Sequence, residues 1–247
     1  MMETPSMAAV ESWAETNPGT VRKYNEDNLL ARPELGLWAV ADGAGGHHRG
    51  DLASSMIVEA LAQIPQGLGF DDLTDAVRAS ISATHRALRA AARARGPNVV
   101  IASTFVGMII HADKFCCLWA GDSRAYLLRN GEVLQISRDH SLVQELVDLG
   151  KINLEDAEHH PQANIITRAI GGDQDDIVLD AIIGTAKPDD LFLLCSDGLS
   201  KTMPLAEISR FLQQPERSLM AQKLVAAAID HGGRDNITVL VISVPES

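Results

Sequence analysis

The stretch LGLWAVADGAGGHHRG, residues 35–50, joins an apolar run to a segment rich in glycine. The run ends at Asp42, and four glycines, two histidines and an arginine follow within the next eight residues. A short apolar run that stops at such a segment predicts a buried strand over 35–41. An ionised carboxylate beside a dry core is costly unless it is paired or binds a metal ion, so Asp42 is the first candidate functional residue.

Acidic residues also stand at the ends of four further apolar runs. Neighbouring antiparallel strands place the start of one strand beside the end of the next, so these acids are expected to meet at one edge of the sheets. Clustered carboxylates with few histidines or cysteines favour Mg²⁺, Mn²⁺ or Ca²⁺ over Zn²⁺. The alternative for each acid taken alone is a turn former or a helix cap. The acids are Glu26 and Asp27 before NLL, Asp122 after CLWAG, Asp197 after LFLLCS, and Asp235 before NITVLVIS.

One cation stands close to these acids in the sequence. Arg22 precedes Glu26 by four residues. It has two interpretations, a salt bridge to Glu26 or Asp27, and a guanidinium fork that binds two oxygens of a phosphate. Carboxylates that hold metal ions, together with one arginine, would form a site suited to phosphate hydrolysis.

Apolar and β-branched runs elsewhere predict a chain rich in sheet. The pair Asn130 and Gly131 lies between two such runs and predicts a hairpin, and most connections are too short for crossover helices, so the sheets should be largely antiparallel. Helical periodicity over 50–63, 72–94 and 218–230 adds paired helices, and the combination indicates an α+β fold in layers. The further strands are expected at 29–31, 100–110, 115–120, 125–128, 133–136, 177–183, 191–195 and 237–244.

Length and charge exclude several classes of protein. The 247 residues carry a net charge of −12, which argues against nucleic acid or an anionic membrane as a partner. No apolar run approaches the ~20 residues that cross a bilayer, and the N-terminal stretch lacks the features of a signal peptide. We therefore expect a cytoplasmic protein with a single domain over 1–247. The three cysteines lie inside apolar runs, as expected of reduced, buried thiols.

Seven stretches of the chain, in order, resemble the metal-dependent serine/threonine protein phosphatases, the type-2C or PPM family, in its bacterial branch. The resemblance runs from about Asn17 to Val244, and it implies a four-layer α-β-β-α sandwich of two mainly antiparallel sheets flanked by helix pairs. The segment 141–167, which starts helical and becomes polar, matches the flap of the family, and we expect it to be mobile and to influence substrate choice. The stretches are VRKYNEDNLL, VADGAGGHHRGDLAS, STFVGMII, WAGDSRAYLLRNGEVLQISRDHSLVQELVDLGKI, HPQANIITRAIGG, LLCSDGLSKTM and GGRDNITVLVISV.

The resemblance also implies a site with two Mn²⁺ or Mg²⁺ ions. Asp42 would bridge both ions and the Gly43 carbonyl would bind one of them, while Asp122 matches a position that helps to hold a third, weaker ion. Arg22 matches the arginine that binds phosphate. The other implied residues are Asp197 and Asp235 as direct ligands, Glu26 and Asp27 acting mostly through bound waters, Asn236 as the support of Asp235, and Gly46 and His47 as supporting residues of the loop after Asp42.

The implied mechanism is direct hydrolysis. A water between two dications loses a proton, and the resulting hydroxide attacks phosphorus in line with the departing oxygen, without a covalent phosphoenzyme. The chain departs from the family at Ala44, where many eukaryotic members carry a histidine and bacterial members commonly carry methionine. We therefore expect metal-bound water to protonate the leaving group. His140, His159 and His160 are expected to be ordinary polar loop residues.

The leading hypothesis is a phosphatase of phosphorylated proteins that reverses a cognate Ser/Thr kinase, active as a monomer. The alternatives are a small-molecule phosphoesterase and a non-catalytic phosphoprotein-binding regulator on the same fold, including a regulator of a signalling switch. An exposed, shallow site would favour protein substrates, and a deep, enclosed pocket would favour small molecules.

Overall fold

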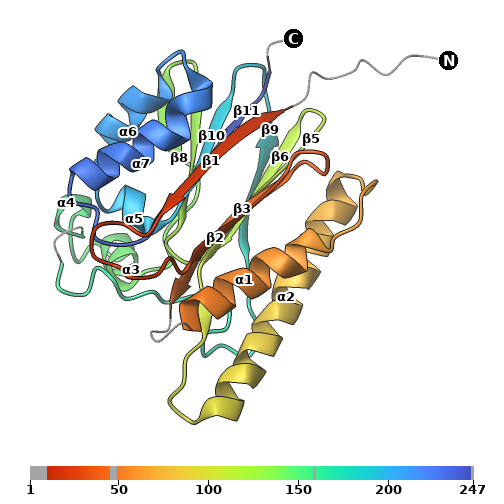
Figure 1. The fold of residues 1–247 in the computed structure, drawn as a ribbon, viewed down its shortest axis with the longest axis vertical. Coiled ribbons are helices and arrows are strands. Elements are labelled where there is room, and N and C mark those ends of the chain that lie inside the picture. Colours follow the sequence, from red (N-terminus) through yellow and green to blue (C-terminus); the bar gives the residue numbers. More distant parts are fainter. Residues whose placement is uncertain (1–9, 45–48, 158–159, 246–247) are drawn as a thin grey trace.

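The computed structural model describes residues 10–44, 49–157 and 160–245, and their strands form two sheets (Figure 1). Every pairing between these strands is antiparallel, as expected from the short connections. Sheet A has the order β1 (Glu11–Asn17), β11 (Ile237–Ser243), β10 (Leu191–Cys195), β7 (Arg124–Arg129) and β8 (Glu132–Gln135). Sheet B has the order β2 (Asp27–Arg32), β3 (Leu37–Ala44), β5 (Phe105–His111), β6 (Lys114–Ala120) and β9 (Asp180–Thr185), with β4 (Ala102–Ser103) beside β3.

Two pairs of helices cover the outer faces of the sheets (Figure 1). The pair α1 (Arg49–Ala62) and α2 (Phe70–Arg95) packs on sheet B, and α6 (Leu205–Leu212) and α7 (Met220–Asp230) pack on sheet A. One apolar cluster lies under each helix pair and a third fills the space between the sheets. The prediction of a four-layer α-β-β-α sandwich is therefore confirmed.

Adjacent cysteines show how strand alternation separates these layers. Cys116 belongs to the cluster under α1 and α2, and its neighbour Cys117 belongs to the cluster between the sheets. Successive side chains of a strand point to opposite faces, so both thiols are buried without meeting. The expectation that the three cysteines are free and buried is confirmed.

The hairpin that Asn130 and Gly131 predict is present between β7 and β8. Both residues have positive φ, 53° and 80°, which is the conformation that a tight hairpin turn of this kind requires. Other boundaries differ from the predictions. The run 100–110 is divided between β4 and β5 at Thr104, and β9 begins only at Asp180.

Strand β1 and helix α6 are among the elements that were not predicted. The strand β1 has the polar sequence ESWAETN at the edge of sheet A, where one side of the strand needs no apolar residues. The helix α6 is short, and its apolar positions Ile208 and Leu212 are four residues apart on one buried face. Within the described residues, none of the helices combines the length and the hydropathy of a membrane span.

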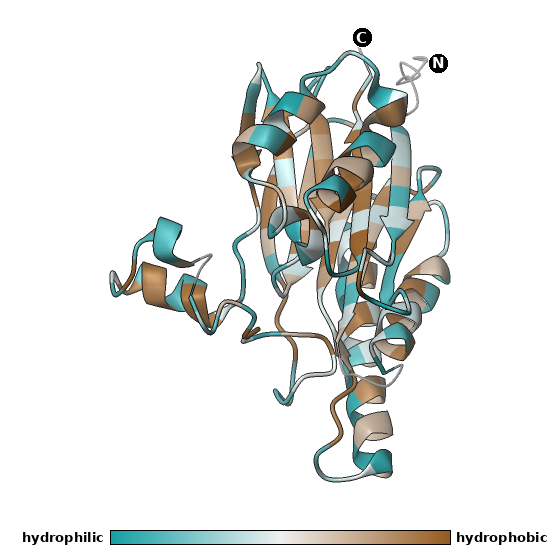
Figure 2. Ribbon diagram, turned by 60° about the vertical axis from the view of Figure 1, so that its left-hand side comes forward, coloured by the Kyte–Doolittle hydropathy of each residue, from teal (hydrophilic) through white to brown (hydrophobic). Residues whose placement is uncertain are grey.

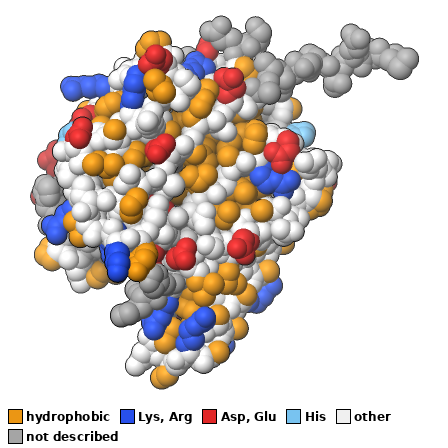
Figure 3. Space-filling view, viewed as in Figure 1, with side chains coloured by type: hydrophobic (Ala, Val, Ile, Leu, Met, Phe, Trp, Pro, Cys, Tyr) orange, Lys and Arg blue, Asp and Glu red, His pale blue; other side chains and the backbone are white. Residues whose placement is uncertain are grey.

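The predicted flap projects from the sandwich as a small separate body (Figure 2). It contains α3 (Leu142–Asp148) and α4 (Leu154–Ala157), and the chain returns to the body through single bridges of Ser141 with Ile166 and of Ser103 with Ile170. Its attachment at the base therefore depends on a few contacts near 141 and 166. On the face shown in Figure 3, acidic and basic side chains are interspersed.

Candidate functional site

Most of the predicted site residues line one cavity of about 590 Å³ at an end of the sandwich. The cavity lies between the two sheets' strand ends, so residues from both ends of the chain meet there. The predicted residues among its lining are Arg22, Glu26, Asp42, Gly43, Asp197, Asp235 and Asn236. Asp122 lines the neighbouring cavity, and Asp27 is buried opposite Asp42 in the sheet.

Asp42 lies within β3 and not at the end of a strand, which corrects the sequence prediction. Its partner in the register of the sheet is Asp27 on β2. Two like charges directly opposite each other destabilise a strand pair, so this position is unfavourable unless a cation or a proton compensates. Burial raises the pKa of Asp42 well above its usual range, and Asp27, Asp197, Asp122 and Asp235 raise it further.

Asp27 is buried and ties the two sheets together. Its Oδ2 accepts hydrogen bonds from Ser196 Oγ at 2.8 Å and from Thr238 Oγ1 at 2.7 Å, while its Oδ1 has no partner among the described residues. Burial raises the pKa of Asp27 to about 7 although these two hydrogen bonds lower it, and the nearby Asp197 raises it further. Asp27 thus supports the site from behind.

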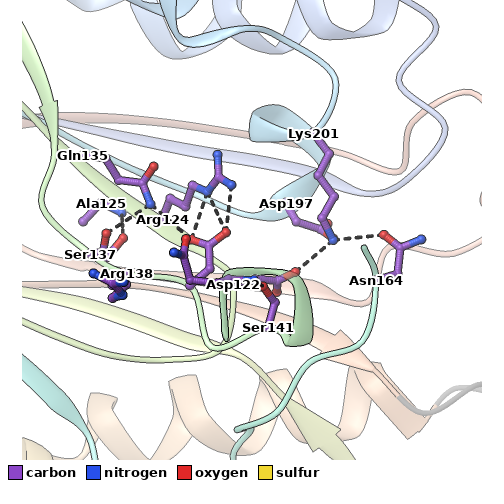
Figure 4. A network of polar contacts seen from close by, with 12 residues as sticks. Asp122, Arg124, Ala125, Gln135, Ser137, Arg138, Ser141, Asn164, Asp197 and Lys201 are labelled. Carbon is purple, nitrogen blue, oxygen red and sulfur yellow. Dashed lines mark hydrogen bonds and ion pairs between the residues drawn. The ribbon is translucent and has the colours of Figure 1, made fainter. Parts of the chain in front are cut away.

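Lys201 lies between two of the predicted metal ligands (Figure 4). Its Nζ donates to Asp197 Oδ2 at 2.7 Å and to Asp122 Oδ2 at 2.9 Å, and it also contacts Asn164 Oδ1 at 3.2 Å. Burial raises the pKa of Asp122 to about 6, Asp197 adds to this effect and Lys201 opposes it. Lys201 was missed by the sequence interpretation, although it follows Asp197 by four residues and α5 (Asp197–Ser200) places the two side chains on one face.

Arg22 pairs with Asp235 and not with Glu26 or Asp27. The fork is bidentate, with Nε 2.8 Å from Oδ1 and Nη2 2.7 Å from Oδ2. The hydrogen bond to Asp235 is the main cause that raises the pKa of Arg22. Side-chain exposures of 56% and 44% place this pair at the open rim of the cavity.

Asn236 connects the loop before β2 to the start of β11. Its backbone N–H donates to Asp235 Oδ1 at 2.9 Å, its side-chain oxygen accepts from the Glu26 N–H at 2.8 Å, and its Nδ2 donates to the Tyr24 carbonyl at 3.0 Å. Gly198 packs against this connection so closely that a Cβ atom would clash with the Asn236 carbonyl oxygen. Asn236 thus links Asp235 to the backbone at Tyr24 and Glu26.

The histidines do not form a second site among the described residues. His140 is buried, and its Nε2 lies 3.2 Å from Asp180 Oδ2 while its Nδ1 accepts from the Gly121 N–H at 3.1 Å. His231 lines the cavity but contacts the Ala227 carbonyl through Nδ1 and Glu207 through Nε2. Gly46, His47, His48 and His159 lie outside the described residues. Ala44 stands at the cavity with no group that exchanges a proton.

The donor set suits hard divalent cations, although no three His, Cys, Asp or Glu side chains of the described residues stand at ready-made metal-binding positions. Two basic side chains occupy acids of the site, since Arg22 forms an ion pair with Asp235 and Lys201 forms one with Asp197. Burial and the neighbouring acids raise the pKa of Asp42, and Asp27 keeps a buried oxygen that has no partner among the described residues. Oxygen donors without competing thiolates are the ligands of Mg²⁺ and Mn²⁺, so these residues fit such ions.

Comparison with known proteins adds independent evidence. The family model described as Protein phosphatase 2C matches residues 22–229, which is most of the chain. The matched range includes the site residues from Arg22 to Lys201 and ends before Asp235.

The chain belongs to the protein phosphatase 2C family.

Its relatives in this family are serine/threonine phosphatases by name. The chain is 37% identical over 231 residues to the serine/threonine protein phosphatase PstP of Mycobacterium tuberculosis, an alignment that covers 94% of this chain and 44% of PstP. The chain therefore spans about half the length of this relative.

Two solved structures of the protein phosphatase 2C fold are similar over nearly the whole chain. PppA, described as a key regulatory component of T6SS in Pseudomonas aeruginosa, is 41% identical with a TM-score of 0.88 and covers 96% of this chain and 98% of its own. The catalytic domain of PstP in complex with 2 manganese ions is 36% identical with a TM-score of 0.82, covering 96% of this chain and 99% of its own.

Proposed function

We propose that this chain is a metal-dependent protein serine/threonine phosphatase that hydrolyses phosphoserine and phosphothreonine. The observation that carries the proposal is the pairing of Asp27 with Asp42 across β2 and β3, next to Asp197 and Asp235. An excess of negative charge at one cavity favours bound cations, and the same charge would repel a phosphate in their absence.

Asp42, Asp197 and Asp235 would hold two Mn²⁺ or Mg²⁺ ions, with the Gly43 carbonyl as a further ligand and Glu26 and Asp27 acting mostly through water. The ions, when bound, activate water for attack and offset negative charge on the phosphate. The manganese ions in the catalytic domain of PstP, a relative of the same fold, support this assignment. Both oxygens of Asp235 contact Arg22, so an ion would compete with the guanidinium for this carboxylate, and its binding would free Arg22.

Arg22 then binds the phosphate. A guanidinium presents two parallel N–H groups that match two phosphate oxygens. Its place at the open rim puts it where a phosphorylated side chain enters. Cys195 takes no part as a nucleophile, because it is fully buried and burial raises its pKa to about 12. The phosphoryl group is therefore transferred directly to water.

The openness of the cavity favours protein substrates over small molecules. Arg22 and Asp235 expose about half of their side chains at the rim, and the flap residues Asn164 and Ile166 form one wall. A surface of this kind admits a phosphorylated side chain on a peptide backbone without enclosing it. A cognate Ser/Thr kinase would supply such substrates. The proposed active form is a monomer.

The test is a comparison of substrates with Mn²⁺ present. We expect kcat/KM for a phosphothreonine peptide to exceed that for a phosphorylated metabolite, such as glycerol phosphate, by roughly tenfold or more, because only the peptide contacts the rim and the flap. EDTA should abolish both reactions. Equal or reversed values would support the small-molecule phosphoesterase, and no turnover with either would support the non-catalytic regulator.

Replacement of Arg22 by alanine should mainly raise KM for phosphopeptide. The loss of one charge-assisted hydrogen-bonding fork corresponds to about 1.5–3 kcal/mol, or roughly a tenfold to hundredfold change in binding. Steady-state kinetics with saturating Mn²⁺ measures it, and Arg22→Lys should recover only part of the loss because it lacks the fork. If KM is unchanged in Arg22→Ala, the residue serves only as the salt-bridge partner of Asp235.

A further inference from the structure

We propose that the ammonium group of Lys201 takes the place of a third metal ion beside Asp122, so that this chain binds one ion fewer than its acidic residues would otherwise allow. The proposal deepens the proposed function, because it concerns the cations of the same cavity. The resemblance to the phosphatase family assigns Asp122 to a third, weaker ion, and the residues present do not fit that assignment.

The geometry of Lys201 leaves no place for another cation between its two carboxylates. Nζ lies 2.9 Å from Asp122 Oδ2 and 2.7 Å from Asp197 Oδ2 (Figure 4). An ion shared by these two oxygens would have to occupy the position of Nζ itself. The third contact, with Asn164 Oδ1 at 3.2 Å, completes the set of three acceptors for the three ammonium protons.

The burial of Asp122 means that its carboxylate needs a cation beside it. The Asp122 side chain is 2% exposed and the Lys201 side chain 33% exposed. A buried carboxylate must be paired, and Lys201 is the only described basic residue that forms an ion pair with it. The other oxygen, Asp122 Oδ1, is buried without a partner among the described residues. The carboxylate would therefore accept a metal ion once the ammonium is removed.

The covalent tether favours lysine over a dissolved ion. Lys201 follows the short helix α5, one turn after Asp197, so the two side chains meet at helical spacing. A tethered group acts at an effective concentration in the millimolar range or above, and a weakly bound metal ion must compete with it. A metal ion that displaced the Lys201 ammonium would also leave this ammonium in the cavity without its carboxylate partners.

The same lysine connects the cavity to the flap. Asn164 lies in the segment that leads from α4 back to the sandwich, and it contributes to both the catalytic cavity and the neighbouring cavity under the flap. A third metal ion would dissociate when metal is scarce. An ammonium does not, so attachment of the flap at Asn164 becomes independent of the metal concentration.

The test counts Mn²⁺ ions per chain by the electron paramagnetic resonance signal of free Mn²⁺ during titration. Lys201→Met keeps an unbranched side chain that is one atom shorter and removes the charge, and Lys223→Met is the matched control, since Lys223 pairs with Glu216 on the surface. We expect Lys201→Met to bind one more ion than the wild type, and the double variant Lys201→Met, Asp122→Asn to lose it again. Circular dichroism verifies the fold, and Lys201→Gln serves if the methionine variant fails to fold.

A second readout follows the flap by hydrogen–deuterium exchange. Amides of residues 160–167 should exchange faster in Lys201→Met than in wild type without metal, and Mn²⁺ should restore protection in the variant. An ion count in Lys201→Met, or in Lys201→Gln if that variant is used instead, equal to that of wild type would overturn the proposal. Hydrogen–deuterium exchange of these amides that the substitution does not change would also overturn it. These readouts need no turnover, so absence of phosphatase activity would overturn the proposed function and leave the Lys201 result interpretable.

Discussion

Asp42→Ala and Asp197→Ala are each expected to lower Mn²⁺-dependent hydrolysis of p-nitrophenyl phosphate by roughly a thousandfold, since a loss of several kcal/mol of charge stabilisation corresponds to that factor. Asp42 lies where the charges of Asp27, Asp197, Asp122 and Asp235 converge. Removal of its carboxylate would take away the proposed ligand whose charge interacts with all four. Initial rates with saturating Mn²⁺ give the measurement.

The two losses should not add. Groups that act on the same ions fail together, so the double variant is expected to be about as slow as either single variant. Asp175→Ala is the control, because Asp175 is 92% exposed and pairs with Arg89 far from the cavity, and it should keep full activity. Activity within tenfold of wild type in both single variants would show that the cavity does not hold the catalytic ions.

The metal-free protein is expected to lose stability as the pH rises from about 4 to above 7. Burial raises the pKa of Asp27 to about 7 and that of Asp122 to about 6, above their values in the unfolded chain. The folded state therefore binds more protons than the unfolded state, and its advantage, complete below the unfolded pKa of about 4, disappears as the pH passes the folded values. The expected loss is on the order of 2–4 kcal/mol for Asp27 alone.

Urea unfolding in EDTA at pH 5 and pH 8 measures this difference. Asp27→Asn keeps an oxygen that accepts from Ser196 and Thr238 but carries no charge, so it should flatten the pH dependence. Excess Mn²⁺ should raise the stability at pH 8, because ions that bind only the folded state shift the equilibrium toward it. Greater stability at pH 8 than at pH 5 without metal would contradict the assignment of these raised pKa values.

Much of the fold could be predicted from the local pattern of the chain. The apolar runs mark most strands because their side chains fill the three apolar layers, and the pair Asn130 and Gly131 marks the hairpin because few residues adopt positive φ. The edge strand β1 escaped notice because its exposed side needs no apolar residues. The true bounds of β3 carry Asp42 into the strand, since pairing with β4 extends the ladder to Ala44.

The basic side chains of the site show which contacts local sequence patterns can predict and which they cannot. Asp197 and Lys201 are four residues apart on a helical turn, so their contact could have been expected from spacing. Asp122 meets the same lysine across 79 residues, and Arg22 meets Asp235 across 213. Spacing in the chain holds no information about such pairs, and the nearer acids Glu26 and Asp27 suggested the wrong partner for Arg22.

Residue types and their periodicity along the chain were enough to predict the layered α+β class. Seven motifs in order carried the resemblance to the family and pointed to the acids that surround the cavity. The folded structure was needed to show that Asp27 opposes Asp42, that Arg22 pairs with Asp235, and that Lys201 lies between Asp122 and Asp197. The balance of charge in the cavity depends on which side chains, distant in the chain, the packing of two sheets brings together.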